Sequence, residues 1–174
     1  MQEDTYMLGL RPYRNDDAGH VISWIDNEYA FRQWSADRYQ SYPITAADMN
    51  AYYEEHRGHA DIWVMSALCF QELAGHFTLR FPDKKRDELR LGFVILNPSL
   101  RNRGYGKEMV SLAVQFAFEF INVPKVSLGV FEHNTPAIRC YRSCGFRDVP
   151  RKKPEQYVCM GEVWSCIEME LARF

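Results

Sequence analysis

Residues 91–107 constrain the fold of this chain more than any other stretch. An apolar run that includes Phe93–Leu96 stops at Asn97 and Pro98, and four apolar residues in a row suit a strand buried on both faces. Beyond the stretch, apolar residues recur at steps of three and four from Met109 to Phe120, which is typical of one helix face packed on a sheet. The stretch therefore predicts a strand, a glycine-containing loop and a helix.

The predicted loop has the features of an anion site. Gly104 and Gly106 lack a β-carbon, so their backbone can approach a ligand closely. The first N–H groups of the helix that follows have no partner within the helix, and the positive end of the helix dipole lies there. Arg101, Arg103 and Lys107 add formal positive charge. A phosphorylated ligand fits this combination.

Two common phosphate-binding patterns do not match the loop. A dinucleotide fingerprint needs a third glycine where Met109 stands. A Walker A loop needs glycine where Arg101 stands and serine or threonine where Glu108 stands. The pattern that remains is Arg-x-x-Gly-x-Gly between a strand and a helix, and a basic tight turn without a ligand is its structural alternative.

This pattern resembles motif A of the GCN5-related N-acetyltransferases, in which the loop binds the pyrophosphate of acetyl-coenzyme A. A second segment, about 30 residues downstream, resembles motif B of the same family, Asn-x-x-Ala-Ile-x-x-Tyr-x-x-x-Gly-Phe. It matches at all fixed positions, which are Asn134, Ala137, Ile138, Tyr141, Gly145 and Phe146. Together the two motifs identify the chain as resembling this family, in detail over residues 88–146.

The resemblance implies an α/β (α+β) fold with a mostly antiparallel mixed sheet, helices on both faces, and two central parallel strands that splay apart. Acetyl-CoA is then the co-substrate, and its acetyl-bearing arm pairs with the open backbone of the first splayed strand. The residues implied in binding it are Val94, Ile95 and Leu96 on the strand, Arg101, Asn102, Arg103, Gly104, Tyr105, Gly106 and Lys107 in the loop, and Asn134 on the arm.

The resemblance makes Tyr141 the general acid. A phenol with a pKa of about 10 stays protonated at neutral pH and can donate to a thiolate whose thiol has a pKa of about 8.5. A tyrosine of the core is the structural alternative. The general base is less defined, because one family position for a glutamate is Arg90 here and another is Gly129. Glu88, two residues before Arg90 and on the same strand face, is a weak substitute.

The predicted function is N-acetyl transfer from acetyl-CoA to a primary amine of a small molecule or a peptide, by direct attack in a ternary complex. The departures at the base positions leave an alternative open, a catalytically impaired acyl-CoA-binding module. Transfer of a longer acyl chain is a third option. The pattern is closest to the ribosomal-protein and polyamine acetyltransferase branches of the family.

Composition bounds the remaining properties. A chain of 174 residues with 47% hydrophobic residues fits one domain, residues 1–174. A net charge of −2 argues against a nucleic-acid partner. No apolar run spans a membrane and no leader is evident at the N-terminus, so we expect a cytoplasmic protein with no membrane partner. Five irregularly spaced cysteines predict packed thiols and no metal. The oligomeric state stays open, with a homodimer as one option.

Charge is unevenly distributed along the chain. Residues 1–60 contain ten Asp or Glu against five Arg, whereas residues 61–174 contain thirteen acids against sixteen bases. This acidic third suits a cationic acceptor amine, and a solvated surface explains it equally well.

Periodicity predicts the other elements. The expected strands are Tyr6–Leu10, 60–70, 75–81, 88–96, 125–130, 145–149 and 163–171, with a charged loop at 82–87 and a basic loop at 151–155. The expected helices are 16–29 capped by Asn15, a capping-box helix from Thr45 to His56, the helix after the loop, and one in 135–144. In the family that the chain resembles, the first two helices and the segment between them form much of the acceptor pocket. The resemblance thus implies that aromatic residues there, such as Trp34, line its wall, and core packing is their structural alternative.

Overall fold

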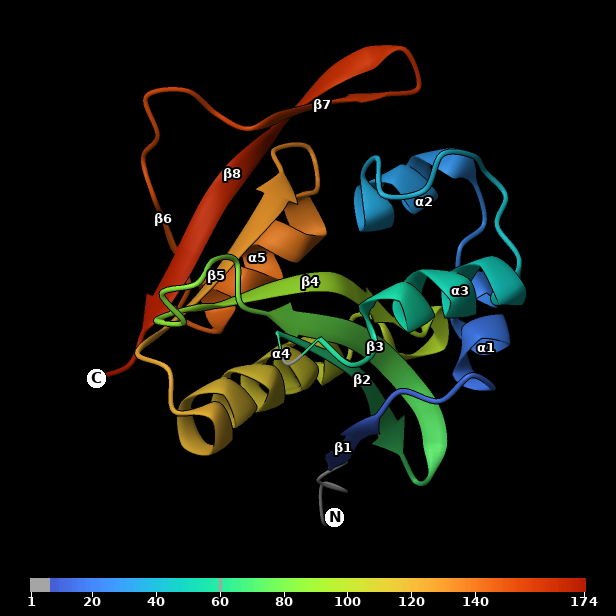
Figure 1. The fold of residues 1–174 in the computed structure, drawn as a ribbon, viewed down its shortest axis with the longest axis horizontal. Coiled ribbons are helices and arrows are strands. Elements are labelled where there is room, and N and C mark those ends of the chain that lie inside the picture. Colours follow the sequence, from blue (N-terminus) through green and yellow to red (C-terminus); the bar gives the residue numbers. More distant parts are fainter. Residues whose placement is uncertain (1–6, 60) are drawn as a thin grey trace.

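A mixed sheet forms the centre of the molecule (Figure 1). The computed structural model describes residues 7–59 and 61–174. The eight strands run in the order β1-β2-β3-β4-β5-β8-β6, with β7 paired to β8 beyond this path. Among the strand pairs of the described residues, only β4 and β5 are parallel, and every other pair is antiparallel. The predicted mixed, mostly antiparallel sheet is thus confirmed.

The elements follow the chain in this order. The strands are β1 Leu8–Pro12, β2 Ile62–Cys69, β3 Glu72–Arg80, β4 Leu89–Leu96, β5 Lys125–Phe131, β6 Arg147–Asp148, β7 Gln156–Cys159 and β8 Glu162–Ala172. The helices are α1 Asp17–Ser23, α2 Glu28–Ser35, α3 Ala46–His56, α4 Tyr105–Gln115 and α5 Thr135–Ser143. A 3₁₀ turn, Pro98–Leu100, precedes α4, and a π-helical segment, Phe116–Ile121, extends it.

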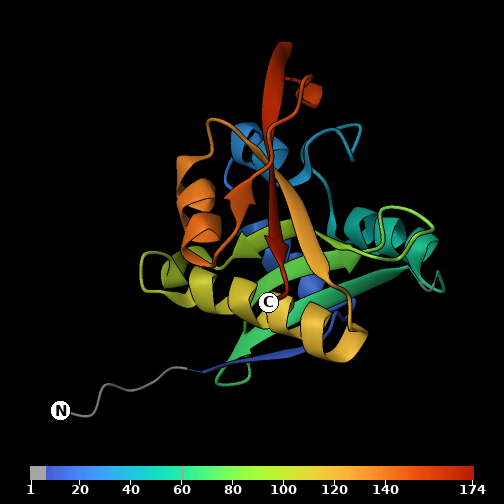
Figure 2. The ribbon, with the colours of Figure 1, turned by 90° about the vertical axis from the view of Figure 1, so that its left-hand side faces the viewer.

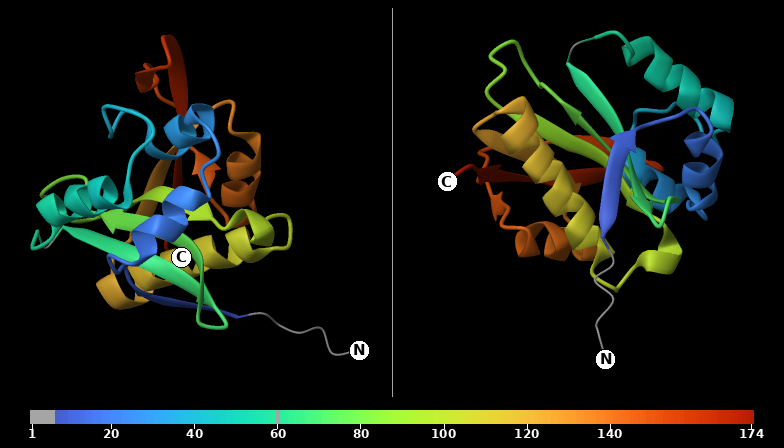
Figure 3. Two further views of the ribbon diagram at one scale, coloured as in Figure 1. Left: turned by 90° about the vertical axis from the view of Figure 1, so that its right-hand side faces the viewer. Right: turned by 90° about the horizontal axis from the view of Figure 1, so that it is seen from below.

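Two hydrophobic clusters cover the two faces of the sheet. Residues of α4 and α5 pack with the strands in one cluster, whereas α1, α2 and α3 form the other. Figure 3 (right) shows α4 and α5 on one side of the strands and α1 and α3 on the other, and Figure 2 shows the same separation from the side. The prediction of helices on both faces is confirmed.

Strand β4 changes face at a bulge. Leu89 and Leu91 belong to the α4 cluster, but Phe93 and Ile95 belong to the α1–α3 cluster. Since alternate residues of a strand share a face, this switch needs one inserted residue. It lies at Phe93, which has a φ of +49° at the shift in the β3–β4 register. The apolar run Phe93–Leu96 therefore packs against clusters on both faces, as predicted, with Ile95 buried and the other three residues half-buried.

Strands β4 and β5 separate after a short paired start. Their register joins Leu89 to Val126 and Arg90 to Ser127 and ends there. Figure 1 shows the two strands diverging, with α2 lying opposite the opening. The predicted splayed parallel pair is present.

Several local predictions differ from the structure. The helix expected over 16–29 is two helices, because Asn27 adopts an extended conformation and its side chain accepts a hydrogen bond from Ala30 N, which starts α2. Asp16, rather than Asn15, precedes α1. The Thr45 capping box of α3 is confirmed. Strand β7 was not predicted, and Tyr6 lies outside the described residues.

Within residues 7–59 and 61–174, no helix combines the length and the apolar character that crossing a membrane requires.

Candidate active site

Two cavities meet at the opening between β4 and β5. The loop-side cavity, of about 760 Å³, is lined by the end of β4, the loop before α4, the start of α4 and one face of α5. The arginine-side cavity, of about 450 Å³, lies on the other side and includes Arg38, Arg80 and Arg90. Residues that line both are Gln33, Trp34, Val94, Asn134, Ala137 and Tyr141. A molecule in one cavity can therefore reach a molecule in the other through the gap in the sheet.

The floor of the loop-side cavity is the predicted anion loop. Gly104 precedes α4 with a φ of +87°, and no side chain caps the helix. Asn102 also has a positive φ, of 59°, so the chain turns sharply at two positions before the helix begins. Arg101 and Lys107 line the same cavity. The uncapped first turn of α4, its dipole and two cations thus face one space that can accept a diphosphate.

Nine of the eleven residues predicted for the co-substrate line the loop-side cavity: Val94, Ile95, Leu96, Arg101, Asn102, Gly104, Gly106, Lys107 and Asn134. The side chains of Arg103 and Tyr105 do not. Tyr105 is 3% exposed and its hydroxyl lies 4.0 Å from Cys69 Sγ, so its ring belongs to the core. The Arg103 guanidinium lies 5.6 Å from the centre of the Tyr105 ring. Their role in binding the co-substrate stays a prediction that the cavity lining does not support.

The edge of β4 that faces the gap has no strand partner beyond Arg90 among the described residues. On this stretch Trp34 Nε1 donates to Phe93 O at 3.0 Å, and Arg101 Nη2 donates to Leu96 O at 3.3 Å. The Trp34 bond ties α2 to the bulge of β4. Trp34, a predicted wall residue, lines both cavities.

Tyr141 lies on α5 where the two cavities join. It is 8% exposed and packs edge-on against Phe146. Its hydroxyl has no hydrogen-bond partner among the described residues. Burial raises the pKa of Tyr141 far above that of an ordinary phenol. The hydroxyl thus remains protonated at neutral pH and is free to donate to a ligand.

The position of Glu88 does not favour its predicted role as a base. Glu88 lines neither cavity. Its carboxylate lies 2.7 Å from Lys125 Nζ and accepts a hydrogen bond from Ser127 Oγ at 3.3 Å. Glu88 precedes the first residue of β4, so it lies at the paired end of β4 and β5, away from the opening, although it shares a strand face with Arg90.

Arg90 occupies the space of both family glutamate positions. Its guanidinium donates to both carboxylate oxygens of Glu168, at 2.6 and 2.9 Å. A β-carbon added to Gly129 would lie 2.9 Å from Arg90 Nη2, so Arg90 covers this glycine. Although burial opposes it, the bond to Glu168 raises the pKa of Arg90. The chain thus has a guanidinium at the place where the family resemblance implied a carboxylate.

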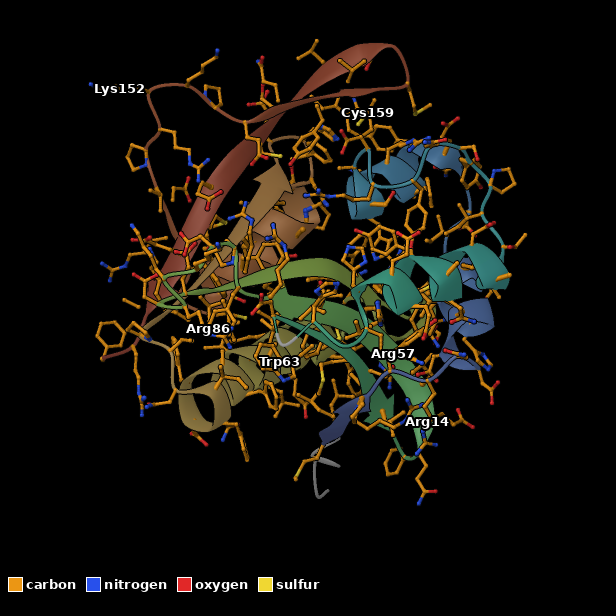
Figure 4. All side chains as sticks on the ribbon, in the orientation of Figure 1. Arg14, Arg57, Trp63, Arg86, Lys152 and Cys159 are labelled. Atoms are coloured by element: carbon orange, nitrogen blue, oxygen red, sulfur yellow. The ribbon has the colours of Figure 1, made fainter. Side chains whose placement is uncertain are left out.

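The β7–β8 hairpin forms the far wall of the arginine-side cavity. Glu155 and Tyr157 line it from this hairpin. Cys159 and Trp164 pack with Phe131, and Ala36 after α2 joins this cluster. In Figure 4, Cys159 lies on the side of the hairpin that faces α2. The hairpin and the end of α2 therefore enclose the cavity together.

Sequence reasoning missed several lining residues. Trp24, Ile25, Asp26 and Ala30 line the loop-side cavity from the α1–α2 connection, and Arg139, Cys140 and Ser143 line it from α5. Those on α5 could have been found, since they lie within one helical turn of Tyr141. Those near α2 could not, because they reach the cavity only through tertiary packing. Among the described residues no group of three or more His, Cys, Asp or Glu is placed to bind a metal ion.

Comparison with known proteins agrees with this geometry. The chain is 24% identical over 165 residues to the spermidine N(1)-acetyltransferase of Escherichia coli strain K12, a match that covers 94% of this chain and 85% of that protein. A crystal structure of spermidine N-acetyltransferase from Vibrio cholerae in complex with CoA and spermine superposes with a TM-score of 0.80 at 19% identity, over 95% of each chain.

A structure of a probable acetyltransferase superposes with a TM-score of 0.78 at 14% identity, over 97% of this chain and 94% of that one. These structural matches show the fold. The model of the acetyltransferase (GNAT) family matches residues 20–146, which include both motifs, both sides of the β4–β5 opening and Tyr141. The chain therefore belongs to the acetyltransferase (GNAT) family.

Proposed function

We propose that this acetyl-CoA-dependent N-acetyltransferase transfers the acetyl group directly to the amine of a small molecule while both substrates are bound. The observation that carries the proposal is the pair of cavities that share Tyr141 and Val94 across the β4–β5 gap. Acetyl-CoA supplies an activated thioester. The protein contributes positioning, polarisation and proton transfer.

The loop-side cavity fits the co-substrate. The first turn of α4, with Arg101 and Lys107, would hold the diphosphate, and Asn134 would contact the pantetheine arm. The Asn134 side chain makes no capping bond to α5, so its amide is available to a ligand. The open edge of β4 at Val94–Leu96 would pair with the amide groups of the arm.

Tyr141 would protonate the leaving thiolate. Its hydroxyl is protonated at neutral pH, has no protein partner and lies where the two cavities meet. Among the described residues, Asp26 is the one acid in the loop-side lining and Glu155 the one acid in the arginine-side lining, and neither hydrogen-bonds with Tyr141. We propose that water in this cavity carries the amine proton to solvent.

A Tyr141→Phe variant tests this assignment. The substitution removes one hydroxyl and leaves the packing against Phe146 in place, so we expect kcat to fall by about 10²- to 10⁴-fold, the usual contribution of a general acid. The dissociation constant of acetyl-CoA, measured by isothermal titration, should change less than about threefold. An unchanged rate of thiol release would remove Tyr141 from the mechanism.

The same assays separate the alternatives. Binding of acetyl-CoA without turnover on a broad amine panel would favour an acyl-CoA-binding module. Faster release of thiol from a longer acyl-CoA than from acetyl-CoA would favour transfer of a longer chain.

The comparisons favour a small molecule over a peptide as the acceptor. The matched proteins from Escherichia coli and Vibrio cholerae are named as spermidine acetyltransferases, and these names support a small-molecule amine as the acceptor here. Homodimer formation stays a prediction. The surface that would serve it is the projecting β7–β8 hairpin, where Val158, Met160 and Val163 are exposed.

A further inference from the structure

The arginine-side cavity carries an unusual charge for a site that receives an amine. Arg38, Arg80 and Arg90 line it with His56, and Glu155 is the only acidic residue in this lining within 7–59 and 61–174. The acidic N-terminal third contributes no carboxylate to this lining among the described residues. The balance of charge therefore favours an anion over a polycation.

Arg80 and Arg90 are directly opposite each other in the antiparallel β3–β4 pair. Like charges at opposed positions of a ladder destabilise it. Arg90 is compensated by Glu168 and, at 3.9 Å, by Glu155. Arg80 is only partly exposed and has no carboxylate or hydrogen-bond partner among the described residues. Burial, followed by the charges of Arg90 and Arg38, lowers its pKa, and a guanidinium nevertheless stays charged at neutral pH.

An uncompensated, partly buried guanidinium aimed into a cavity is costly unless a ligand pairs with it. Guanidinium groups bind carboxylate and phosphate by two parallel hydrogen bonds. Arg38, exposed at the rim of the same cavity, can join Arg80 on the same oxyanion.

We propose that the acceptor is an amine that also carries an oxyanion, a carboxylate or a phosphate, which Arg80 and Arg38 bind while the amine faces Tyr141. This inference rests on the proposed function and narrows its acceptor. It differs from a polyamine, whose second ammonium would meet Arg80. The aromatic side chains of Trp34, Tyr52, Phe93 and Tyr157 would contact the carbon skeleton between the two groups.

The same charges help to explain how an amine loses its proton without a carboxylate base. A cation beside other cations is disfavoured, so the ammonium of a bound acceptor releases its proton at a lower pH than in water. The titratable or charged groups that line the cavity are Arg38, Tyr52, His56, Arg80, Arg90, Tyr141, Glu155, Tyr157 and Cys166. In the kcat–pH profile the acidic limb should lie below the pKa of the free amine, and Arg80→Gln should move it upward.

The test compares matched amines in a thiol-release assay at saturating acetyl-CoA. The pairs are 4-aminobutyrate with 1,4-diaminobutane, and O-phosphoethanolamine with ethanolamine, and spermidine is included. We expect the anionic member of at least one pair to have a kcat/KM at least tenfold above its counterpart and above spermidine. The pair that shows the preference distinguishes carboxylate from phosphate. Preference for 1,4-diaminobutane or spermidine would overturn the inference.

Arg80→Gln is the diagnostic variant, and Arg14→Gln is its control. Arg14 is exposed between β1 and α1 (Figure 4), so its loss changes net charge equally without touching the cavity. We expect Arg80→Gln to raise KM for the anionic acceptor about tenfold or more while the acetyl-CoA dissociation constant stays unchanged. It should also raise the melting temperature of the free protein by about 1–3 °C, because the opposed charges are removed. Arg14→Gln should do neither, and an unchanged KM in Arg80→Gln would contradict the proposal.

If none of these amines is acetylated, the inference is tested by whether the arginine-side cavity binds an anion. With CoA saturating the loop-side cavity, inorganic phosphate should raise the melting temperature of the wild-type protein and not that of Arg80→Gln. Equal shifts in both, or none, would overturn the inference. Failure of the proposed function is distinct, because it would appear as absent acetyl-CoA binding in titration or as binding without turnover on a broad amine panel.

Discussion

Gly104 has a φ of +87° at the first turn of α4, and an L-residue in this conformation costs about 1–2 kcal/mol. A β-carbon there would meet no atom within 4 Å, so the residue is not required by packing. The space that it leaves open belongs to the loop-side cavity. Because glycine has no side chain, it allows both this backbone conformation and the access of a ligand to the amides at the start of α4.

Gly104→Ala should therefore weaken acetyl-CoA binding as well as stability. Gly58→Ala is a matched control, because Gly58 has a φ of +90°, is equally uncrowded and lines neither cavity. Both variants should lose about 1 kcal/mol of unfolding free energy in urea. Only Gly104→Ala should raise the dissociation constant of acetyl-CoA, by about tenfold. Equal affinities in the two variants would show that the loop does not bind the diphosphate.

The residues of the loop could be predicted because they are contiguous and their chemistry is local. The backbone turn, the helix start and the cations appear together in residues 101–107. The arginines of the other cavity could not be predicted in this way. Arg38, Arg80 and Arg90 come from three separate segments, and only strand register and the path of the chain after α2 bring them to one space. The position of Glu88 outside both cavities was also hidden, since a shared strand face does not show at which end of the strand a residue lies.

At the scale of elements, the site depends on the bulge in β4. The bulge turns Phe93 toward the α1–α3 cluster while Val94 and Leu96 pack with the α4 cluster. Trp34 of α2 fixes it by donating to Phe93 O. The pattern of the run could not reveal the bulge, because both faces of β4 are apolar and the face switch leaves no mark in the sequence. The split between α1 and α2 was equally hidden. The apolar helical spacing continues on both sides of Asn27, so this spacing alone does not show that a new helix begins there.

Trp34→Phe should loosen this connection. The variant keeps an aromatic ring and loses the indole N–H, so we expect about 1–2 kcal/mol less unfolding free energy and a several-fold lower kcat/KM. Trp63→Phe is the control, because Trp63 packs against Phe81 and Phe116 on the other face and lines neither cavity. Urea denaturation and thiol-release kinetics measure both effects. A kcat/KM equal in the two variants would mean that the bulge does not depend on Trp34.

At the scale of the whole molecule, strands from both ends of the described chain, β1 and β8, belong to one sheet. We propose on this ground that residues 1–174 act as one domain. The two motifs predicted the parallel centre of this sheet, because a strand, loop and helix followed by another strand allow few arrangements. The contribution of the β7–β8 hairpin to the acceptor wall needed the structure, since β7 is short and its pairing is not local to the motifs.

Acid should destabilise the whole fold through the buried pair of His76 and Tyr53, which lies between the sheet and α3. His76 Nε2 lies 2.7 Å from the Tyr53 hydroxyl, and burial lowers the pKa of His76 to about 3. An unfolded histidine has a pKa near 6.5, so the unfolded state binds the additional proton between these values and stability falls as pH decreases from about 6.5 toward 3. Asp17 behaves differently. Burial opposes its charge, but hydrogen bonds from Arg11, Arg14 and Ser66 lower its pKa to about 2. The stability that the Asp17 carboxylate contributes to the fold is therefore lost only below about pH 4.

We therefore expect the unfolding free energy to drop by on the order of 2 kcal/mol between pH 7 and pH 4.5, measured by urea denaturation. His59→Asn, at an exposed position, should leave the drop unchanged, whereas His76→Asn should reduce it. A drop that persists in full in His76→Asn would assign the acid sensitivity to other groups.

The central claim is that the acetyl group passes directly between two bound substrates, without an acyl-enzyme. Cys140 is the thiol nearest to such a role, since it lines the loop-side cavity, but its hydrogen bond with Cys144 and its burial raise its pKa and disfavour the thiolate. The decisive measurement mixes the protein with acetyl-CoA in the absence of any amine and follows free CoA thiol by quenched flow, with the protein mass recorded in parallel. We expect no burst and an unmodified protein. A burst of one equivalent with an acetyl group on Cys140 would contradict it.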